Sequence, residues 1–355
     1  MSISKTYRTA FAAVAAASLA LAGCSSSEED AEKTAEETTE EAEAEETEES
    51  ESAEETEGET KAAEPGTATV QSWQGAVEVP VPPKRPVVTD NRAFQILEAW
   101  GVDLVAAPRK LMSPELAYRS NEDIADLGMH FEPNLEALVA AEPDVVLNGY
   151  RFASYFEDMK ELVPDAVVVD ISMDFAENGL AEEFKKQLDL LGTVFQKEDE
   201  AAALYADFEE ARDRAKEAYD PEQSVMGLLT SGGKIAYAAP GTGRSVGPLF
   251  TALDLTPAYE QEGEDNTHGD EISVEAIAEA NPDWIIVLDR DAAFPHEDGD
   301  GYQTAEELIT NSEALQNVTA VEKGQIYVLP ATFYVTEDII EYTEVLNALA
   351  DSFEG

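Results

Sequence analysis

Two segments of the chain repeat the same order of apolar and polar positions, 139 residues apart. Residues 135–141 and 274–280 each carry apolar residues at the spacing of a short amphipathic helix. A Pro-Asp pair follows, and then an unbroken apolar run at 145–147 and 284–286, typical of a strand buried on both faces. One arginine follows each strand, Arg151 and Arg290. The repeat predicts two similar α/β lobes, each with an arginine at the strand end where open α/β sheets bind ligands.

The pattern along the rest of the chain alternates in the same way. Alternation of strands and helices predicts mainly parallel sheets with right-handed crossovers, hence two Rossmann-like lobes. Two helical segments, 180–195 and 199–219, separate them, and the second, long and continuous, predicts a rigid helical connection. We expect an N-terminal lobe over 67–178, connecting helices over 179–220 and a C-terminal lobe over 221–355. The other predicted strands are 86–88, 104–106, 166–171, 225–230, 234–239 and 325–329, and the other helices 91–100, 246–253 and 337–353.

The N-terminus has the pattern of a targeting segment. Lys5 and Arg8 precede an apolar run at 10–22 that is too short to span a bilayer. The run ends in Leu-Ala-Gly-Cys, which resembles a bacterial lipobox and implies a signal peptide over 1–23 and a diacylglyceryl group on Cys24. The alternative is an ordinary signal peptide with an incidental cysteine. Since Cys24 is the only cysteine, an internal disulfide is excluded.

The segment 24–66 is of low complexity and strongly acidic. Residues 28–64 hold 19 acidic and two basic side chains, too few apolar groups to offset chain entropy, so we expect a disordered linker between the membrane and the folded lobes. An acidic interaction tail is the alternative. The formal charge of the whole chain is −54, which argues against binding nucleic acid through phosphates.

Arginine is scarce and its placement is informative. Nine arginines follow the acidic segment. Besides Arg151 and Arg290, Arg244 lies in a glycine-rich turn after the strand 234–239. If the lobes face each other, the three guanidinium groups converge on one cleft, which suits an anion such as a carboxylate, phenolate or phosphate. The alternative is a local salt bridge for each, and Asp289 and Asp291 flank Arg290.

Other chemistry-bearing residues are few. The histidines are His130, His268 and His296; His268 lies in a loop before the second repeat, whereas His296 lies in an acidic insertion at 295–301 and is expected at the surface. By itself His268 indicates only an exposed loop side chain. Tyr334, after the last predicted strand, is either a packing residue or a residue of the cleft edge.

An enzyme signature also occurs. Residues 243–247 fit G-x-S-x-G around Ser245, but the turn is not tight after its strand and no histidine follows His296. A serine hydrolase is therefore a remote alternative, and no enzymatic activity is expected. Zinc patterns with H-E-x-x-H or paired C-x-x-C are absent from the sequence.

These motifs together resemble a known family, the substrate-binding lipoproteins of ABC importers for ferric siderophores. The resemblance covers roughly residue 79 to the C-terminus. Residues 132–136 and 143–146 resemble the family broadly, and 266–273, 281–283 and 287–293 resemble its catecholate branch. The resemblance implies class III periplasmic-binding-protein architecture, two lobes joined by one long helix.

The resemblance also implies residue roles. Arg151, Arg244 and Arg290 would hold the anionic oxygens of the siderophore. His268 and Tyr334 would complete the coordination of its Fe(III) when the siderophore supplies only four oxygens. The protein would need no cofactor of its own. The same scaffold binding haem, cobalamin or a hydroxamate siderophore is the main alternative, and a surface-interaction protein without a small ligand is another.

One glutamate of each lobe would dock the permease in such a family. These match Glu136 and Glu275, again 139 residues apart. The alternative is a local role for both in the first turn of a helix, after the caps Asn134 and Ser273. The resemblance thus implies a monomeric, lipid-anchored protein on the extracytoplasmic face of the cell membrane, with an ABC permease as its partner.

Overall fold

The computed structural model describes residues 66–263, 267–294 and 301–355, all within one compact unit, Lys61–Gly355. The predicted signal peptide, Cys24, nearly all of the linker and His296 lie outside the described residues. In the described segments, none of the helices combines the length and the apolar character that a bilayer crossing requires.

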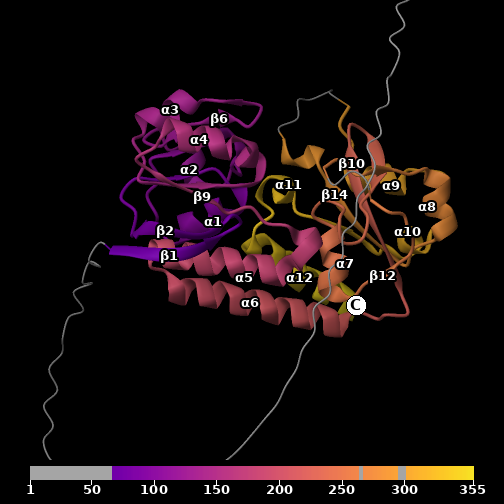
Figure 1. Cartoon of the computed structure of the whole chain (residues 1–355). Coiled ribbons are helices and arrows are strands. Elements are labelled where there is room, and N and C mark those ends of the chain that lie inside the picture. The colour runs from indigo at the N-terminus through magenta and orange to yellow at the C-terminus, as the bar shows by residue number, and fades with distance from the viewer. Residues whose placement is uncertain (1–65, 264–266, 295–300) are drawn as a thin grey trace, which may run out of the picture. The chain divides into compact units, whose positions relative to one another are not determined.

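The N-terminal lobe, coloured indigo to magenta in Figure 1, is built on a parallel sheet with the strand order β5-β4-β3-β8-β9. Its central strands bear valine and leucine side chains that are fully buried, because helices cover both faces. The strands are β3 (Pro86–Val88), β4 (Ala106–Ala107), β5 (Ala125–Asp126), β8 (Val145–Asn148) and β9 (Val167–Asp170). The other elements of the lobe are α1 (Asn91–Ala99), η1 (Arg109–Leu111), α2 (Ala117–Ser120), β6 (Gly128–Met129), β7 (Glu132–Pro133), α3 (Leu135–Ala140), η2 (Tyr150–Tyr155) and α4 (Phe156–Leu162).

The C-terminal lobe has a mixed sheet with the order β13-β11-β10-β14-β15, and β12 also pairs with β10. The pairs of β10 with β12 and β14, and of β14 with β15, are parallel, whereas β11 is antiparallel to both β10 and β13. The strands are β10 (Ser224–Ser231), β11 (Lys234–Tyr237), β12 (Thr256–Pro257), β13 (Asp270–Glu271), β14 (Trp284–Asp289) and β15 (Ile326–Val328). The other elements are α7 (Gly247–Leu253), α8 (Val274–Ala280), η3 (Asp291–Ala293), α9 (Ala305–Thr310), α10 (Thr319–Lys323), α11 (Phe333–Thr336) and α12 (Ile339–Glu354).

The sequence repeat is also a structural repeat. Asn134 and Ser273 cap α3 and α8, each accepting a hydrogen bond of 3.1 Å from the backbone N–H three residues later. The Pro-Asp breaks have the same function in both lobes: Asp144 accepts from the backbone of Arg85, and Asp283 from that of Ser224. Each carboxylate thereby ties the start of the repeat strand to its parallel neighbour. The prediction of two similar α/β lobes with mainly parallel sheets is confirmed.

Two long helices connect the lobes, α5 (Phe175–Phe195) and α6 (Glu198–Ala218), which run side by side beneath both sheets (Figure 1). Phe184 of α5 lies at their centre, with its ring centroid 5.4 Å from that of Phe208 in α6 and 5.5 Å from that of Tyr342 in α12. One apolar core therefore continues from the N-terminal lobe through these helices into the C-terminal lobe. Such a core restrains the lobes more than a flexible linker would.

The structure differs from the expected elements at several places, and the short helices α2, α4, α9 and α10 were not predicted. A hairpin of β1 (Gly66–Ser72) and β2 (Gly75–Val81) was not predicted and begins inside the expected linker; its Val70 and Val79 are buried in the shared core. The strand expected at 104–106 is β4, two residues long and displaced toward the C-terminus. The closing helix does not begin at Glu337, which has a left-handed backbone, φ 49°, but after Asp338, whose carboxylate caps α12.

Candidate functional site

A cavity of about 420 Å³ lies where the two lobes and the start of α5 meet. Its polar walls come from α1 and η2 of the N-terminal lobe, from the crossover between β9 and α5, and from the glycine-rich turn before α7. The charged side chains that line it are Arg92, Asp174, Arg244 and Glu337. The cavity thus lies at the carboxyl ends of the β3 and β9 strands, as expected for an open α/β fold.

The three arginines singled out in the sequence converge on one residue, Tyr334 of α11. The guanidinium carbon of Arg244 lies 4.0 Å from the centroid of the Tyr334 ring, that of Arg151 5.2 Å and that of Arg290 5.3 Å. Arg151 and Arg244 also donate to the backbone carbonyl of Tyr334, over 3.1 and 2.9 Å. Residues 183 positions apart in sequence therefore meet, and one arginine of each repeat reaches the same aromatic side chain.

This environment changes the acidity of the Tyr334 phenol. Burial alone would raise its pKa, but the charges of Arg244, Arg290 and Arg151, together with a hydrogen bond from Arg290, outweigh burial and lower the pKa. The cations stabilise the phenolate form. The expected local salt bridge of Arg290 is also present, with Asp291 at 3.1 Å, so this arginine takes part in both arrangements.

The glycine-rich turn explains how Arg244 reaches the cavity. A Cβ atom at Gly243 would collide with the backbone of Ala238 and Ala239, and one at Gly247 would lie 2.5 Å from the carbonyl oxygen of Ala239. Both glycines are therefore required for the turn to fold back on the end of β11. The tight turn directs Arg244 inward, where its side chain is 8% exposed.

His268 follows Thr267 of the cavity wall but does not itself line the cavity. Its imidazole is exposed, and its Nδ1 is 2.8 Å from the hydroxyl of Thr267, which does line the cavity. Residues 264–266, which open this loop, lie outside the described part of the chain. Iron ligation by His268 and Tyr334 therefore stays a prediction.

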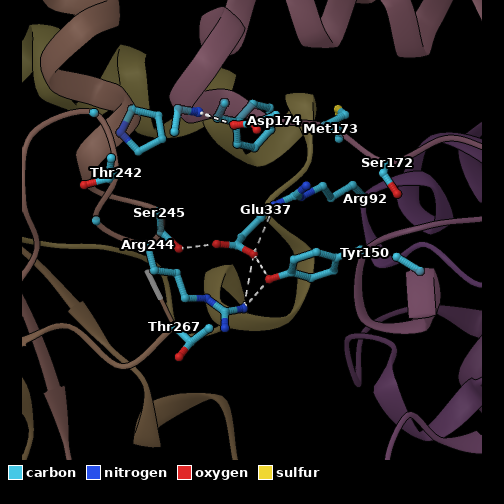
Figure 2. A pocket seen from close by; sticks show the side chains of 16 residues that line it. Arg92, Tyr150, Ser172, Met173, Asp174, Thr242, Arg244, Ser245, Thr267 and Glu337 are labelled. Atoms are coloured by element: carbon cyan, nitrogen blue, oxygen red, sulfur yellow. Dashed lines mark hydrogen bonds and ion pairs between the residues drawn. The ribbon is translucent and has the colours of Figure 1, made fainter. Parts of the chain in front are cut away.

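Glu337, which the sequence places at the start of the closing helix, is a buried carboxylate that lines the cavity. Figure 2 shows Glu337 between the lobes, with Ser245 on one side and Tyr150 on the other. The Glu337 carboxylate accepts from the hydroxyls of Ser245 and Tyr150 and from Nη2 of Arg244 at 3.2 Å. Arg92 approaches it to 3.8 Å. These contacts, led by the charges of Arg244 and Arg92, overcome burial and lower the pKa of Glu337 to about 2.

Arg92 lines the cavity together with Arg244, whereas Arg151, Arg290 and Tyr334 are not among its lining residues, and Arg92 was also missed. Its guanidinium lies 4.1 Å from the ring centroid of Tyr150 and 4.6 Å from that of Phe175, so it is sandwiched between the two rings. Burial would lower its pKa, but Tyr150, Glu337 and Asp90 together raise it. Arg92 lies in the first turn of α1, and no sequence motif around it indicates its role.

Ser245 does not have the surroundings of a hydrolase nucleophile. It is buried, and its hydroxyl donates to the buried carboxylate of Glu337 rather than to a histidine. In residues 66–263, 267–294 and 301–355, no group of three or more His, Cys, Asp or Glu side chains is arranged to hold a metal ion. Glu136 and Glu275 are both exposed in the first turns of α3 and α8.

Comparison with known proteins places these features in a family. The family described as periplasmic binding protein matches residues 87–332. The petrobactin-binding protein YclQ of Bacillus subtilis is 25% identical over 286 residues, which cover 79% of this chain and 86% of the relative. Its crystal structure matches with a TM-score of 0.70 at 22% identity, over 82% of this chain and 99% of that one.

Two further relatives show the same extent of similarity. The ferric-anguibactin-binding protein FatB of Vibrio anguillarum is 27% identical over 267 residues, 73% of this chain and 82% of the relative. The crystal structure of the periplasmic catecholate-siderophore binding protein VctP of Vibrio cholerae matches with a TM-score of 0.68 at 21% identity, over 80% and 99% of the two chains. Since the family match spans well over half of the sequence, the chain belongs to the periplasmic binding protein family.

Proposed function

We propose that the protein captures an anionic ferric siderophore of the catecholate class in the cleft between its lobes and delivers it to an ABC permease. The observation that carries the proposal is the convergence of Arg151, Arg244 and Arg290 around Tyr334 in a chain of net charge −54. Guanidinium groups pair well with anionic oxygens, and a partly desolvated cleft strengthens the attraction. The names of the relatives, which bind petrobactin, ferric anguibactin and catecholate siderophores, support this ligand class.

The arginines retain capacity for a ligand. Within the described residues, the buried Nε of each of Arg92, Arg151, Arg244 and Arg290 has no hydrogen-bond partner. A buried donor without a partner costs free energy, which an anionic ligand would recover. Two of these arginines, Arg92 and Arg244, line the cavity, and Arg151 and Arg290 meet Arg244 at Tyr334, which favours an anion over a neutral ligand.

The chemistry of Tyr334 and His268 fits direct contact with the iron of the chelate. Fe(III) is a hard cation that accepts phenolate oxygen and imidazole nitrogen. The lowered pKa of Tyr334, caused by the arginines against the effect of burial, favours the phenolate that ligation requires. A siderophore with four donor oxygens would gain the two missing ligands from these side chains.

Titration with three classes of ligand tests the proposal. Quenching of tryptophan fluorescence measures the dissociation constant of each ligand. We expect tight binding of a ferric bis-catecholamide and weak binding of haem and of a ferric hydroxamate. Arg244→Gln should weaken the catecholamide by about 100-fold, the value of a buried charge-assisted pair. Arg214→Gln is the matched control, because this exposed arginine on α6 pairs with Asp351 and Glu354 instead. Tighter binding of haem or hydroxamate than of the catecholamide would replace the proposal by one of those alternatives.

Delivery and anchoring belong to the same proposal. Glu136 and Glu275 are exposed at equivalent places in the two repeats, which suits recognition by paired arginines of a permease. The lipobox-like sequence before Cys24 would attach the monomer to the extracytoplasmic face of the cell membrane, and two or more acyl chains give stable anchoring. Labelling with a radioactive fatty acid that persists in Cys24→Ser would exclude this anchor.

A further inference from the structure

Glu337 is an anion built into a site that should attract anions. Its side chain is 3% exposed, and its carboxylate accepts hydrogen bonds from Tyr150 of the N-terminal lobe and from Arg244 and Ser245 in the turn of the C-terminal lobe. Arg92 of the N-terminal lobe adds an ion pair at 3.8 Å. The closest partner among the cations, Arg244, is the same arginine that lies on the Tyr334 ring. The carboxylate therefore shares a cation with the expected ligand site.

The backbone bears a cost to form this arrangement. Tyr150, Ser245 and Glu337 have φ angles of 49°, 60° and 49°, in the left-handed region that non-glycine residues rarely adopt. Each such residue costs on the order of the energy of a hydrogen bond. In the described segments Gln196, Asp254 and Asn281 have this conformation where they end helices, and Glu337 likewise ends α11. Tyr150 and Ser245 end no helix, and both hydroxyls donate to the Glu337 carboxylate, so the strain at these two residues points to a functional arrangement.

We propose that Glu337 is a specificity-determining residue: a fixed counter-anion that lowers the positive charge of the cleft and thereby selects ferric chelates of low negative charge. The inference rests on the proposed function and names its substrate class more closely. Two catecholates on one Fe(III) leave a charge of −1, and three leave −3. A fixed negative charge repels the second chelate three times as strongly as the first, because Coulomb energy is proportional to the ligand charge.

Glu337 is suited to this role because it cannot lose its charge easily. Three hydrogen-bond donors and the nearby Arg92 surround it, and solvent reaches little of it, so neither protonation nor rotation toward water relieves the repulsion. The low-charge chelate is also the one with open coordination positions for Tyr334 and His268. Selection by charge and selection by coordination therefore favour the same class of ligand.

The test compares Glu337→Gln with the unaltered protein, using ferric bis-catecholamide and ferric tris-catecholamide as ligands. Glutamine keeps the shape and an acceptor oxygen and removes the charge. We expect affinity to rise ~5-fold for the bis-complex and ~100-fold for the tris-complex, as one unit charge at roughly 8 Å through a high effective dielectric would give. Glu183→Gln is the matched control, because this carboxylate is equally buried but lines a different cavity on α5. It should leave the ratio of the two affinities unchanged.

A second variant, with the opposite expected effect on affinity, keeps the test decisive if Glu337→Gln does not fold. Arg92→Gln removes a positive charge beside the same carboxylate and should weaken the tris-complex more than the bis-complex. Equal changes for the two chelates in either variant would overturn the charge-selection proposal while leaving the binding function intact. Failure of the unaltered protein to bind either chelate would instead refute the proposed function.

Discussion

Replacement of the Tyr334 phenol offers the most direct test of whether the protein ligates the iron of the chelate. Replacing Tyr334 by phenylalanine removes one oxygen and leaves the ring, so the contacts of Arg151, Arg244 and Arg290 with the ring face remain. The expected loss is that of one charge-assisted interaction, about 3 kcal/mol, or about 100-fold in affinity. It should apply to a ferric bis-catecholamide, which leaves coordination positions open. A ferric tris-catecholamide saturates its iron and should change by less than about 3-fold.

The same variant should change the dependence of binding on pH. Ligation by Tyr334 displaces its hydroxyl proton, so the affinity for the bis-complex should increase with pH until the pKa of Tyr334 is reached. Because Arg244, Arg290 and Arg151 overcome burial and lower that pKa, the increase should end at a lower pH than an ordinary tyrosine would give. In Tyr334→Phe the slope should fall by about one proton.

Fluorescence titration of both chelates between pH 6 and about 10 measures these quantities, and visible absorption of the iron–phenolate bond reports ligation itself. Tyr327→Phe is the matched control, since this half-buried tyrosine of β15 lies outside the arginine cluster. An equal loss for both chelates, or a slope that Tyr334→Phe leaves unaltered, would refute iron ligation by this residue.

Three further predictions address other parts of the molecule. His268→Ala should weaken the ferric bis-catecholamide by about 10-fold or more and the tris-complex little, measured by the same titration; equal losses would argue against imidazole ligation. Glu136→Arg combined with Glu275→Arg should abolish uptake of radioactive iron in cells while ligand affinity stays unchanged, and normal uptake would remove the docking assignment. Phe184→Ala should lower the free energy of unfolding by about 3–5 kcal/mol in denaturant titration, because the ring fills the core that joins the lobes; a loss below about 1 kcal/mol would show that the lobes are stabilised separately.

The fold could be predicted in good part from local pattern. The strand at 145–147 and its equivalent at 284–286 are unbroken apolar runs, and the structure buries both completely. The caps Asn134 and Ser273 act within three residues of themselves, so their effect was readable from the sequence. The β1–β2 hairpin was missed although Val77, Val79 and Val81 alternate with other residues, because the low-complexity acidic segment was expected to extend to residue 66.

The candidate site could be predicted only in part. Arg151 and Arg290 were found because the repeat places them at equivalent strand ends, and Arg244 because a glycine-rich turn marks its loop. Arg92 and Glu337 were not found. Arg92 lies in a helix with no motif around it. Glu337 lies just before α12, where the sequence predicts only an ordinary glutamate at the start of a helix.

The sequence by itself determined the two lobes, their parallel strands and the arginines at the strand ends, because periodicity, caps and turns act over a few residues. Only the tertiary structure decided that three arginines would meet at Tyr334 and that a buried carboxylate would hold two cations beneath them. The contact between Tyr150 and Glu337 spans 187 residues of chain, and it exists because the core around α5 and α6 holds the lobes together. Because these charged groups are buried together between the lobes, the interactions between them are strong. No local pattern in the sequence indicates this burial.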